Sequence, residues 1–473
     1  MLFNSAEFLI FFPLVVMAYF ATPSRFRWLL LLAAGYYFYA CWRVEYLALL
    51  IFSTVVDYVA GRLMASTAVP ARRKMFLILS LCSNLGLLFF FKYYNFIGGS
   101  ANYIADNWNL FWHLPELRVL LPVGISFYTF QSLSYTIDVY RGVMQPEKHL
   151  GIFAAFVSFF PQLVAGPIER AHSLLPQFHE EHHFSRVFLW EGLQLMLWGF
   201  VKKVAIADRL SLYVNPVYND PGSHSPLAIL VATYFFAFQI YCDFSGYSDI
   251  ARGSAKIMGF DLMFNFRQPY LSQSIREFWQ RWHISLSTWF RDYVYIPLGG
   301  NRNHALRNIF LTFLVSGLWH GANWTFVIWG ALHGLYLVIS TVTRDMRATL
   351  VEATGLNRTP RLLAALRTVT TFHLVLFGWI FFRANSIQDA ITVLRKLTEL
   401  PGLTAIGQPF ASPADLMFVI CAMGILAAAS AFMRRPQMWQ SSFLLRAATL
   451  SVLFWFVVTF GVFNNRQFIY FQF

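Results

Sequence analysis

One histidine in this sequence stands in a setting suited to acid–base chemistry. His320 lies within Ser316-Gly-Leu-Trp-His-Gly-Ala-Asn-Trp324, a short polar stretch between two apolar runs. Ionisable residues at membrane depth are costly and are functional candidates, and an apolar setting keeps an imidazole neutral, the form a general base needs. Gly317 and Gly321 flank it, so we expect the backbone to break or pack closely there. The alternative is a core histidine hydrogen-bonded to a neighbouring helix.

A second polar stretch, Gln239-Ile-Tyr-Cys-Asp-Phe-Ser-Gly-Tyr-Ser-Asp249, closes another apolar run. Its carboxylates and hydroxyls could line a polar tunnel or hydrogen-bond the arginines of 276–291. Asp and Ser are also favoured where a helix begins. The stretch is therefore equally well explained as a helix end followed by the N-cap of the next helix.

The segment 274–293 combines arginines, aromatic residues and His283. Its aromatic and leucine residues recur at three- and four-residue steps, which predicts one helix with an apolar stripe. Such a helix could lie in the membrane interface. Alternatively, it could fold into the protein and line a polar cavity at membrane depth. The stripe consists of Phe278, Trp282, Leu286, Trp289 and Tyr293, and the other face carries Arg276, Arg281 and Arg291.

Two further histidine signals are better explained without chemistry. His333, in Trp329-Gly-Ala-Leu-His-Gly334, need not share a face with His320, and structural packing is the simpler interpretation. The run His179-Glu-Glu-His-His183 lies in a charged loop and lacks the HExxH order of a zinc site. We therefore expect no metal. Walker, GxGxxG and GxSxG motifs are absent, so nucleotide-driven transport and α/β-hydrolase chemistry lack support.

The elements that position these residues are membrane helices. The chain has 473 residues, of which 57% are hydrophobic and 12% charged, about half the usual charged share of a soluble domain. Its apolar runs are continuous, whereas barrel strands alternate apolar and polar residues. The net charge is +13, and the positive residues lie mostly between apolar runs. This placement is typical of membrane proteins that follow the positive-inside rule, and it does not favour nucleic-acid binding.

The sequence predicts an all-α, polytopic membrane protein with about 11 crossings, together with re-entrant or interfacial helices around a central tunnel. We expect a single membrane domain over 1–473, with its catalytic core at about 119–340. The candidate spans are 7–21, 28–42, 46–60, 75–91, 119–140, 151–165, 187–206, 226–247, 309–319, 323–340, 368–383, 414–432 and 445–463.

Several motifs together resemble the membrane-bound O-acyltransferase (MBOAT) family. The two main ones are Arg281-Trp-His-Ile-Ser-Leu-Ser-Thr-Trp289 and, 37 residues after His283, Trp319-His-Gly-Ala-Asn323. Further stretches resemble its alginate O-acetyltransferase-like branch, which includes cellulose acetylation proteins. These stretches are 241–249, Asn265-Phe-Arg-Gln-Pro-Tyr270, Tyr295-Ile-Pro-Leu-Gly-Gly-Asn301 and Phe468-Ile-Tyr-Phe-Gln-Phe473.

The resemblance implies acetyl transfer from a cytosolic donor to a hydroxyl beyond the far membrane face. His320 matches the family's catalytic histidine, and His283 its second invariant polar residue. We expect His320 to take the hydroxyl proton, while His283 or Asn323 orients the donor or stabilises the oxyanion. The residues expected to bind substrate or line the tunnel are Asp243, Ser245, Tyr247, Asp249, Arg281, Trp282, Trp319 and Asn323.

The expected donor is acetyl-CoA, with no bound cofactor, and arginines of 252–307 could attract such an anion from the inside face. The expected location is the bacterial inner membrane. The expected partners are membrane lipid, a periplasmic or membrane-anchored acetyltransferase and the exopolysaccharide machinery, with no nucleic acid. Two alternatives stay open: D-alanyl or other acyl transfer to a cell-envelope polymer, and a polysaccharide or lipid-linked transporter.

Overall fold

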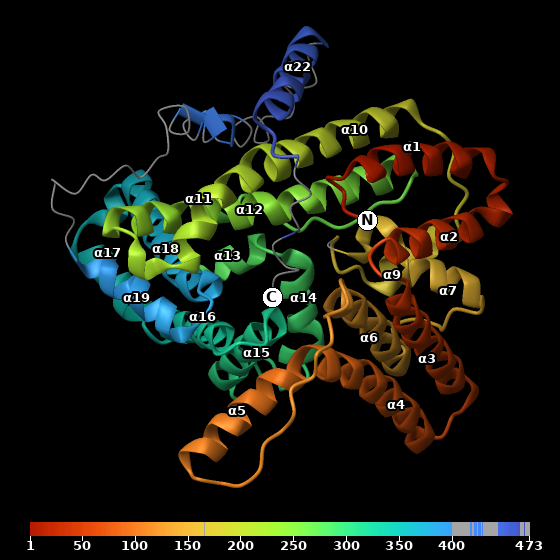
Figure 1. The fold of residues 1–473 in the computed structure, drawn as a ribbon, viewed down its shortest axis with the longest axis horizontal. Helices are drawn as coiled ribbons and strands as arrows, with labels where there is room; N and C mark the ends of the chain where they lie inside the picture. Colours follow the sequence, from red (N-terminus) through yellow and green to blue (C-terminus); the bar gives the residue numbers. More distant parts are fainter. Residues whose placement is uncertain are drawn as a thin grey trace. The chain divides into compact units, whose positions relative to one another are not determined.

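The fold consists of helices joined by loops, of which the one after α5 is long (Figure 1). The computed structural model describes residues 1–164, 166–399, 417–418, 421–422, 424–426, 428, 443–463 and 468. No strand occurs among them, which confirms the predicted all-α class. Packing divides the described chain into two compact units, the first holding 1–196 and 247–264 and the second 197–246 and 265–468. The single domain over 1–473 stays a prediction.

In the first unit, helix α3 packs against α4 and α6 around a buried carboxylate. Asp57 of α3 accepts hydrogen bonds from Ser80 and Asn84 of α4, at 2.6 and 2.8 Å. A buried charge needs such donors to be tolerated. The helices are α1 Ala6–Ala21, α2 Arg27–Ala40, α3 Leu47–Ser66, α4 Pro70–Leu88, α5 Tyr94–Asn107, α6 Ile125–Arg141, α7 Leu150–Val157, α8 Phe160–Leu163, α9 Ala171–Leu174 and most of α10 Arg186–Phe200.

The second unit holds both candidate histidines. Helix α12, Pro226–Ile257, contributes its residues up to 246 to this unit and the rest to the first. A π-helical turn, Val201–Ala207, precedes α11. The remaining helices are α11 Asp208–Asn219, α13 Ile275–Arg281, α14 Ile284–Phe290, α15 Ala305–His320, α16 Trp324–Val342, α17 Arg344–Ala353, α18 Pro360–Arg383, α19 Ile387–Thr398 and α22 Phe443–Phe460.

Several helical stretches are long and apolar enough to cross a membrane, which confirms a multi-pass protein. Among the described residues there are five: Val44–Ser66, Pro70–Asn107, Pro226–Ile257, Trp324–Val342 and Pro360–Arg383. Shorter apolar helices cover Ala6–Ala21 and Ala447–Phe460. The number of about 11 crossings stays a prediction, and the candidate span 414–432 lies largely outside the described residues.

The predicted single helix over 274–293 is wrong. The structure has two short helices, α13 and α14, separated by His283 in the left-handed conformation at φ 42°. Hydrogen bonds from the preceding loop fix the break: the Ile284 amide donates to the Asn265 carbonyl at 3.0 Å, and the Arg267 amide donates to the Arg281 carbonyl at 2.9 Å. The stripe residues Phe278 to Trp289 are buried, so the segment folds into the protein instead of lying on a surface.

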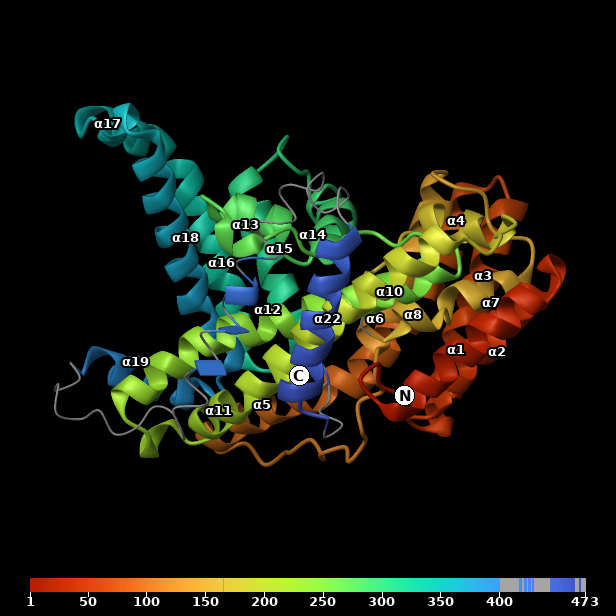
Figure 2. The same cartoon turned by 90° about the horizontal axis from the view of Figure 1, so that it is seen from above.

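Helices α15 and α16 lie side by side (Figures 1 and 2), and two glycines permit their close approach. A Cβ atom on Gly317 would lie 2.3 Å from the Phe326 carbonyl oxygen, and one on Gly330 would lie 2.4 Å from that of Phe313. Real Cβ atoms do not approach a backbone so closely. The close packing expected near His320 is thereby confirmed at Gly317.

Candidate active site

His320 is the last residue of α15 and lies in an aromatic surround. The residue is buried, with an exposed fraction of 3%. Its ring centroid lies 4.9 Å from that of Trp329 on α16 and 5.3 Å from that of Phe382 on α18. Gly321 is the C-cap of the helix, and a Cβ atom there would lie 2.2 Å from the ring of Phe326. The helix thus ends where the imidazole packs against α16 and α18.

His283 lies in the same unit and is fully buried. Its ring packs edge-on against Phe244 of α12, with centroids 4.4 Å apart. Burial lowers the pKa of this histidine, which lies outside the spanning helices, well below its ordinary value. The imidazole is therefore neutral at physiological pH, able to donate a hydrogen bond from one nitrogen and accept one at the other.

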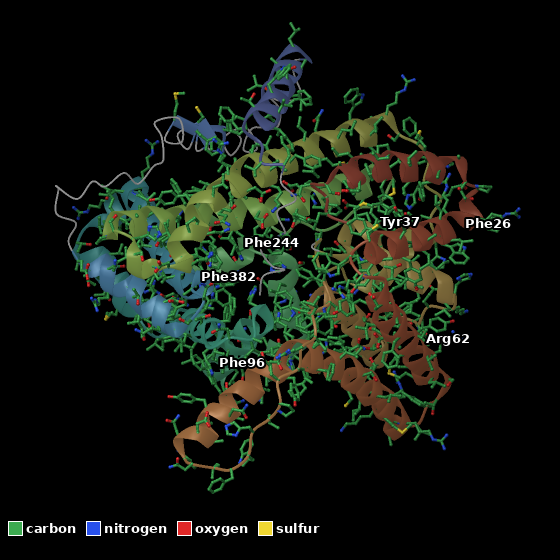
Figure 3. All side chains as sticks on the ribbon, viewed as in Figure 1. Phe26, Tyr37, Arg62, Phe96, Phe244 and Phe382 are labelled. Carbon is green, nitrogen blue, oxygen red and sulfur yellow. The ribbon has the colours of Figure 1, made fainter. Side chains whose placement is uncertain are left out.

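Trp319 connects the two histidines. Its centroid lies 5.0 Å from that of His320 and 6.1 Å from that of His283. Figure 3 labels two flanking aromatics, Phe244 on α12 and Phe382 on α18. The structure therefore brings His283 close to the consecutive residues Trp319 and His320, which lie much further along the sequence. A neutral imidazole in a buried aromatic surround suits proton transfer and hydrogen bonding to a developing charge.

Asp243 and Ser245 lie in the interior of α12 and are buried. The interpretation of 239–249 as a helix end and N-cap is therefore wrong, because the helix continues to Ile257. The alternative, hydrogen bonds to the arginines of 276–291, stays a prediction. The Asp243 carboxylate lies 2.5 Å from the ammonium of Lys203, which also pairs with Asp208 at 2.8 Å. One buried ammonium thus lies between two buried carboxylates.

Lys203 is a residue that the sequence analysis missed. It lies in the π-helical turn between α10 and α11 and is fully buried. Such turns recur at functional sites. The signal was present, because Lys203 stands inside the apolar run 187–206. As an ionisable residue within an apolar run, this lysine is a functional candidate for the same physical reason as His320.

Tyr247 and Asp249 belong to the first unit, unlike the two histidines. The Tyr247 ring stacks on Phe3 with centroids 5.1 Å apart. The Asp249 carboxylate lies 3.7 Å from the guanidinium of Arg252, one helical turn onward. Their expected role in a tunnel stays a prediction.

Arg281 and Trp282 are neighbours that face different surroundings. The Arg281 guanidinium pairs with Glu277 at 2.5 Å and is about one-third exposed. Trp282 is buried and stacks on Phe278 with centroids 5.4 Å apart. Trp282 therefore belongs to the aromatic core of the second unit. The Arg281 side chain forms a pair on its own helix.

Asn323 is the N-cap of α16. Its side-chain oxygen accepts from the Thr325 amide at 3.0 Å, and its side-chain nitrogen donates to the Asn385 carbonyl at 3.0 Å. N-cap bonds satisfy amides that a helix leaves without partners. Asn323 thus fixes the turn after His320 and joins it to the end of α18.

The remaining histidine signals agree with structural roles. The Trp279 indole donates to Nδ1 of His333 at 3.2 Å, so this ring is bonded within the core. The exposed His179 side chain contacts the Glu147 carboxylate at 2.8 Å. Within the described part of the chain, no group of three potential metal ligands occurs.

The fold and this cluster define a class: a multi-pass helical membrane protein with two buried histidines joined by an aromatic side chain. Residues 147–382 match the family model of the membrane-bound O-acyltransferases. The chain belongs to this family, and it is an O-acyltransferase.

Relatives with related names cover most of the chain. It is 46% identical to a protein of Pseudomonas aeruginosa named probable alginate O-acetylase, over 82% of this chain and 73% of that protein. It is 36% identical to a peptidoglycan O-acetyltransferase of Helicobacter pylori, over 85% and 81%. Identity to a teichoic acid D-alanyltransferase of Bacillus subtilis is 29%, over 57% and 70%.

Proposed function

We propose that this O-acyltransferase moves an acetyl group from cytosolic acetyl-CoA across the bacterial inner membrane for O-acetylation of an exopolysaccharide. The observation that carries the proposal is the burial of His320 beside Trp319, in one cluster with His283. The names of the relatives supply the acceptor class, since two of them act on alginate or peptidoglycan. Alginate is the acceptor we favour, because that relative has the higher identity.

The charge pattern of the second unit supports an orientation. Helices α15 and α16 are antiparallel neighbours joined by 321–323, a connection without Lys or Arg. Arg302 and Arg307 flank the start of α15, and Arg344 and Arg347 follow the end of α16. In an antiparallel pair, these four arginines lie at the same end of the two helices. Positive residues favour the cytoplasmic side. His320 then lies toward the extracytoplasmic end of α15, and the arginines lie at the end where acetyl-CoA enters.

The reaction assigns a role to each imidazole. The acceptor hydroxyl oxygen attacks the thioester carbonyl carbon while His320 takes its proton. The tetrahedral intermediate collapses, the carbon–sulfur bond breaks, and the CoA thiolate leaves and receives the proton from the imidazolium. His283 donates a hydrogen bond to the oxyanion or holds the donor in place. The surrounding aromatic side chains exclude water and thus limit hydrolysis of the thioester.

A protein partner completes the proposal. The transferred group must reach a polymer outside the membrane, so we expect a periplasmic or membrane-anchored acetyltransferase to receive it beside the synthesis machinery. The immediate acceptor is then either a sugar hydroxyl or a hydroxyl of that partner.

The test measures transfer of labelled acetyl from acetyl-CoA to polymer in membranes that carry the full chain. His320→Ala should abolish transfer, since a general base contributes about 10²–10⁴-fold. The exposed His179→Ala variant serves as the control and should retain wild-type transfer. Wild-type acetyl content in the His320→Ala membranes would overturn the proposal.

Acyl transfer with D-alanine is the second candidate, because the chain is also similar to D-alanyltransferases. The same membranes distinguish the two: D-alanyl-loaded carrier protein should not replace acetyl-CoA as donor. A transporter would instead require polymer export to depend on the chain while acetyl transfer does not.

A further inference from the structure

We propose that Arg383, together with three asparagines, forms a subsite for the carboxylate of an acidic polysaccharide acceptor next to His320. The inference rests on the proposed function and specifies its acceptor side. Arg383 is the last residue of the spanning helix α18 and is 7% exposed. Lys, Arg and Asp are rarely buried without a charged partner, so a buried guanidinium held by neutral groups indicates affinity for an anion.

The partners of this guanidinium are amide oxygens. Nη2 donates to Oδ1 of Asn215 at 3.0 Å and to Oδ1 of Asn219 at 3.4 Å, both on α11. Nη1 donates to Oδ1 of Asn385 at 3.3 Å. The guanidinium carbon also lies 5.5 Å from the ring centre of Tyr218. Of the carboxylates in the described residues, none forms an ion pair with Arg383.

Acidic residues near in sequence are engaged elsewhere. Asp220 follows Asn219, and its side chain is bonded to Ser223 and lies near His224 and Lys396. The Asp389 carboxylate accepts from the Ser386 hydroxyl at 2.8 Å. The positive charge of Arg383 is thus not neutralised by the acids of the loops on either side.

Two contacts place this cluster beside the candidate active site. Phe382, the preceding residue, has its ring 5.3 Å from the ring of His320. Asn323, three residues after His320, donates to the carbonyl of Asn385 at 3.0 Å. A substrate group held at Arg383 therefore lies close in space to the proposed base, because Phe382 and Asn323 connect the two.

The position along the membrane favours the acceptor over the donor. The ends of α15 and α18 and the start of α16 meet at the end opposite Arg302, Arg307, Arg344 and Arg347. By the positive-inside rule this is the extracytoplasmic end. Phosphates of acetyl-CoA enter from the other side, so the anion that reaches Arg383 belongs to the acceptor. A guanidinium donates charge-assisted hydrogen bonds to a carboxylate, and uronic acid polymers carry one carboxylate per sugar.

Exposure of the neighbouring amides gives the ligand access. Asn219 and Asn385 are exposed, and Asn215 is half-buried. Each amide presents NH₂ donors beside the guanidinium. The competing explanation is that Arg383 only stabilises the C-terminal ends of α18 and α11, as cations do. In that case, substitution of Arg383 lowers the stability of the protein but does not change any preference for a charged over a neutral ligand.

The experiment measures binding of an oligouronate and of a neutral β-1,4-glucan oligomer of equal length to the full chain in nanodiscs. We expect at least tenfold tighter binding of the oligouronate by the wild type. Arg383→Gln should remove this preference without changing binding of the neutral oligomer, and Arg383→Lys should keep part of it. The control is Arg395→Gln, since Arg395 is 80% exposed on α19, and it should retain the preference.

Two results would overturn the subsite: equal binding of both oligomers by the wild type, or an undiminished preference in folded Arg383→Gln. If Arg383→Gln does not fold, Arg383→Lys is measured in its place. Full retention of the tenfold preference in Arg383→Lys would contradict the proposal, as would the lack of any preference in the wild type. Binding is measured without acetyl-CoA and repeated with His320→Ala, which should retain the preference. Failure of acetyl transfer and failure of the subsite are therefore seen separately.

Discussion

At the scale of the residue, the backbone at His283 depends on a side chain 18 positions earlier. Oδ1 of Asn265 accepts from the amide and the hydroxyl of Ser285, at 3.1 and 2.7 Å. A left-handed conformation costs a non-glycine residue about 1–2 kcal/mol. Asn265 compensates this cost and so positions His283 against Trp319.

The first prediction follows for Asn265→Ala. Acetyl transfer should fall about tenfold or more, because displacing a catalytic group by about 1 Å can cost 10²-fold. Asn265→Asp keeps the acceptor oxygen and should retain most of the rate. Transfer of labelled acetyl measures both, at matched amounts of folded protein. Equal rates for wild type and Asn265→Ala would show that the turn at His283 does not need this side chain.

The second prediction concerns Lys203. Lys203→Met leaves Asp208 and Asp243 buried without this cation, and breaking a buried pair costs about 3–5 kcal/mol. The control is Lys256→Met, because Lys256 pairs with Glu191 where both side chains are more than a third exposed. Such surface pairs contribute about 0–1 kcal/mol. Thermal unfolding in detergent should separate the two variants, and similar midpoints would refute the structural role of Lys203.

The third prediction uses Glu169, which lies in a connection of the first unit outside the spanning helices. Burial raises the pKa of this carboxyl from 4.5 to about 8. The folded state therefore favours the protonated carboxyl. Its contribution to the free energy of unfolding is fully present below pH 4.5 and is lost as the pH rises toward 8. Glu169→Gln should remove this part of the pH dependence and be more stable than wild type above pH 8. A wild-type pH profile of the unfolding midpoint in Glu169→Gln would contradict it.

At the scale of the element, the crossing of α15 and α16 determines where His320 lies. Gly317 and Gly330 face each other across it, and a Cβ atom on either would lie 3.1 Å from the Cα atom of the other. A side chain at either position would separate the helices. Trp319 and His320 follow directly on α15, so a small displacement at the crossing moves both rings.

The fourth prediction is a loss of folding or activity for Gly330→Ala. The added methyl group would meet the backbone of α15, which cannot yield as a flexible side chain can. Gly86→Ala on α4 is the matched control, because its Cβ would meet no atom within 4 Å. Overpacking costs about 1–3 kcal/mol, measurable in unfolding midpoints. Equal midpoints and equal acetyl transfer for both variants would disprove the importance of this crossing.

Helices also define what the sequence could and could not predict. Periodicity and hydropathy predicted α3, α16 and the break after His320, because these depend on local residues. The break at His283 and the pairing of Asp243 with Lys203 were not predictable, since each depends on a partner distant in the chain. The length of α12 was underestimated because polar residues in its interior resemble those of a helix end.

At the scale of the whole molecule, the proposed reaction requires acetyl transfer from one side of the membrane to the other. The arginine-rich connection 343–359 should face the cytoplasm, and 321–323 and 384–386 the opposite side. The fifth prediction is that cysteines at Arg344 and Asn385 react with membrane-impermeant reagents from opposite sides. The four native cysteines are first replaced. Labelling of both positions from one side would contradict the proposed orientation.

Sealed vesicles of defined orientation test whether His320-dependent acetyl transfer crosses the membrane. Labelled acetyl-CoA is supplied only on the face that carries 343–359, and acetylated polymer is measured on the opposite face. We expect product with the wild type, none with His320→Ala, and none when the donor is supplied on the polymer side. Transfer that persists in His320→Ala, or that requires donor and polymer on the same face, would contradict this expectation.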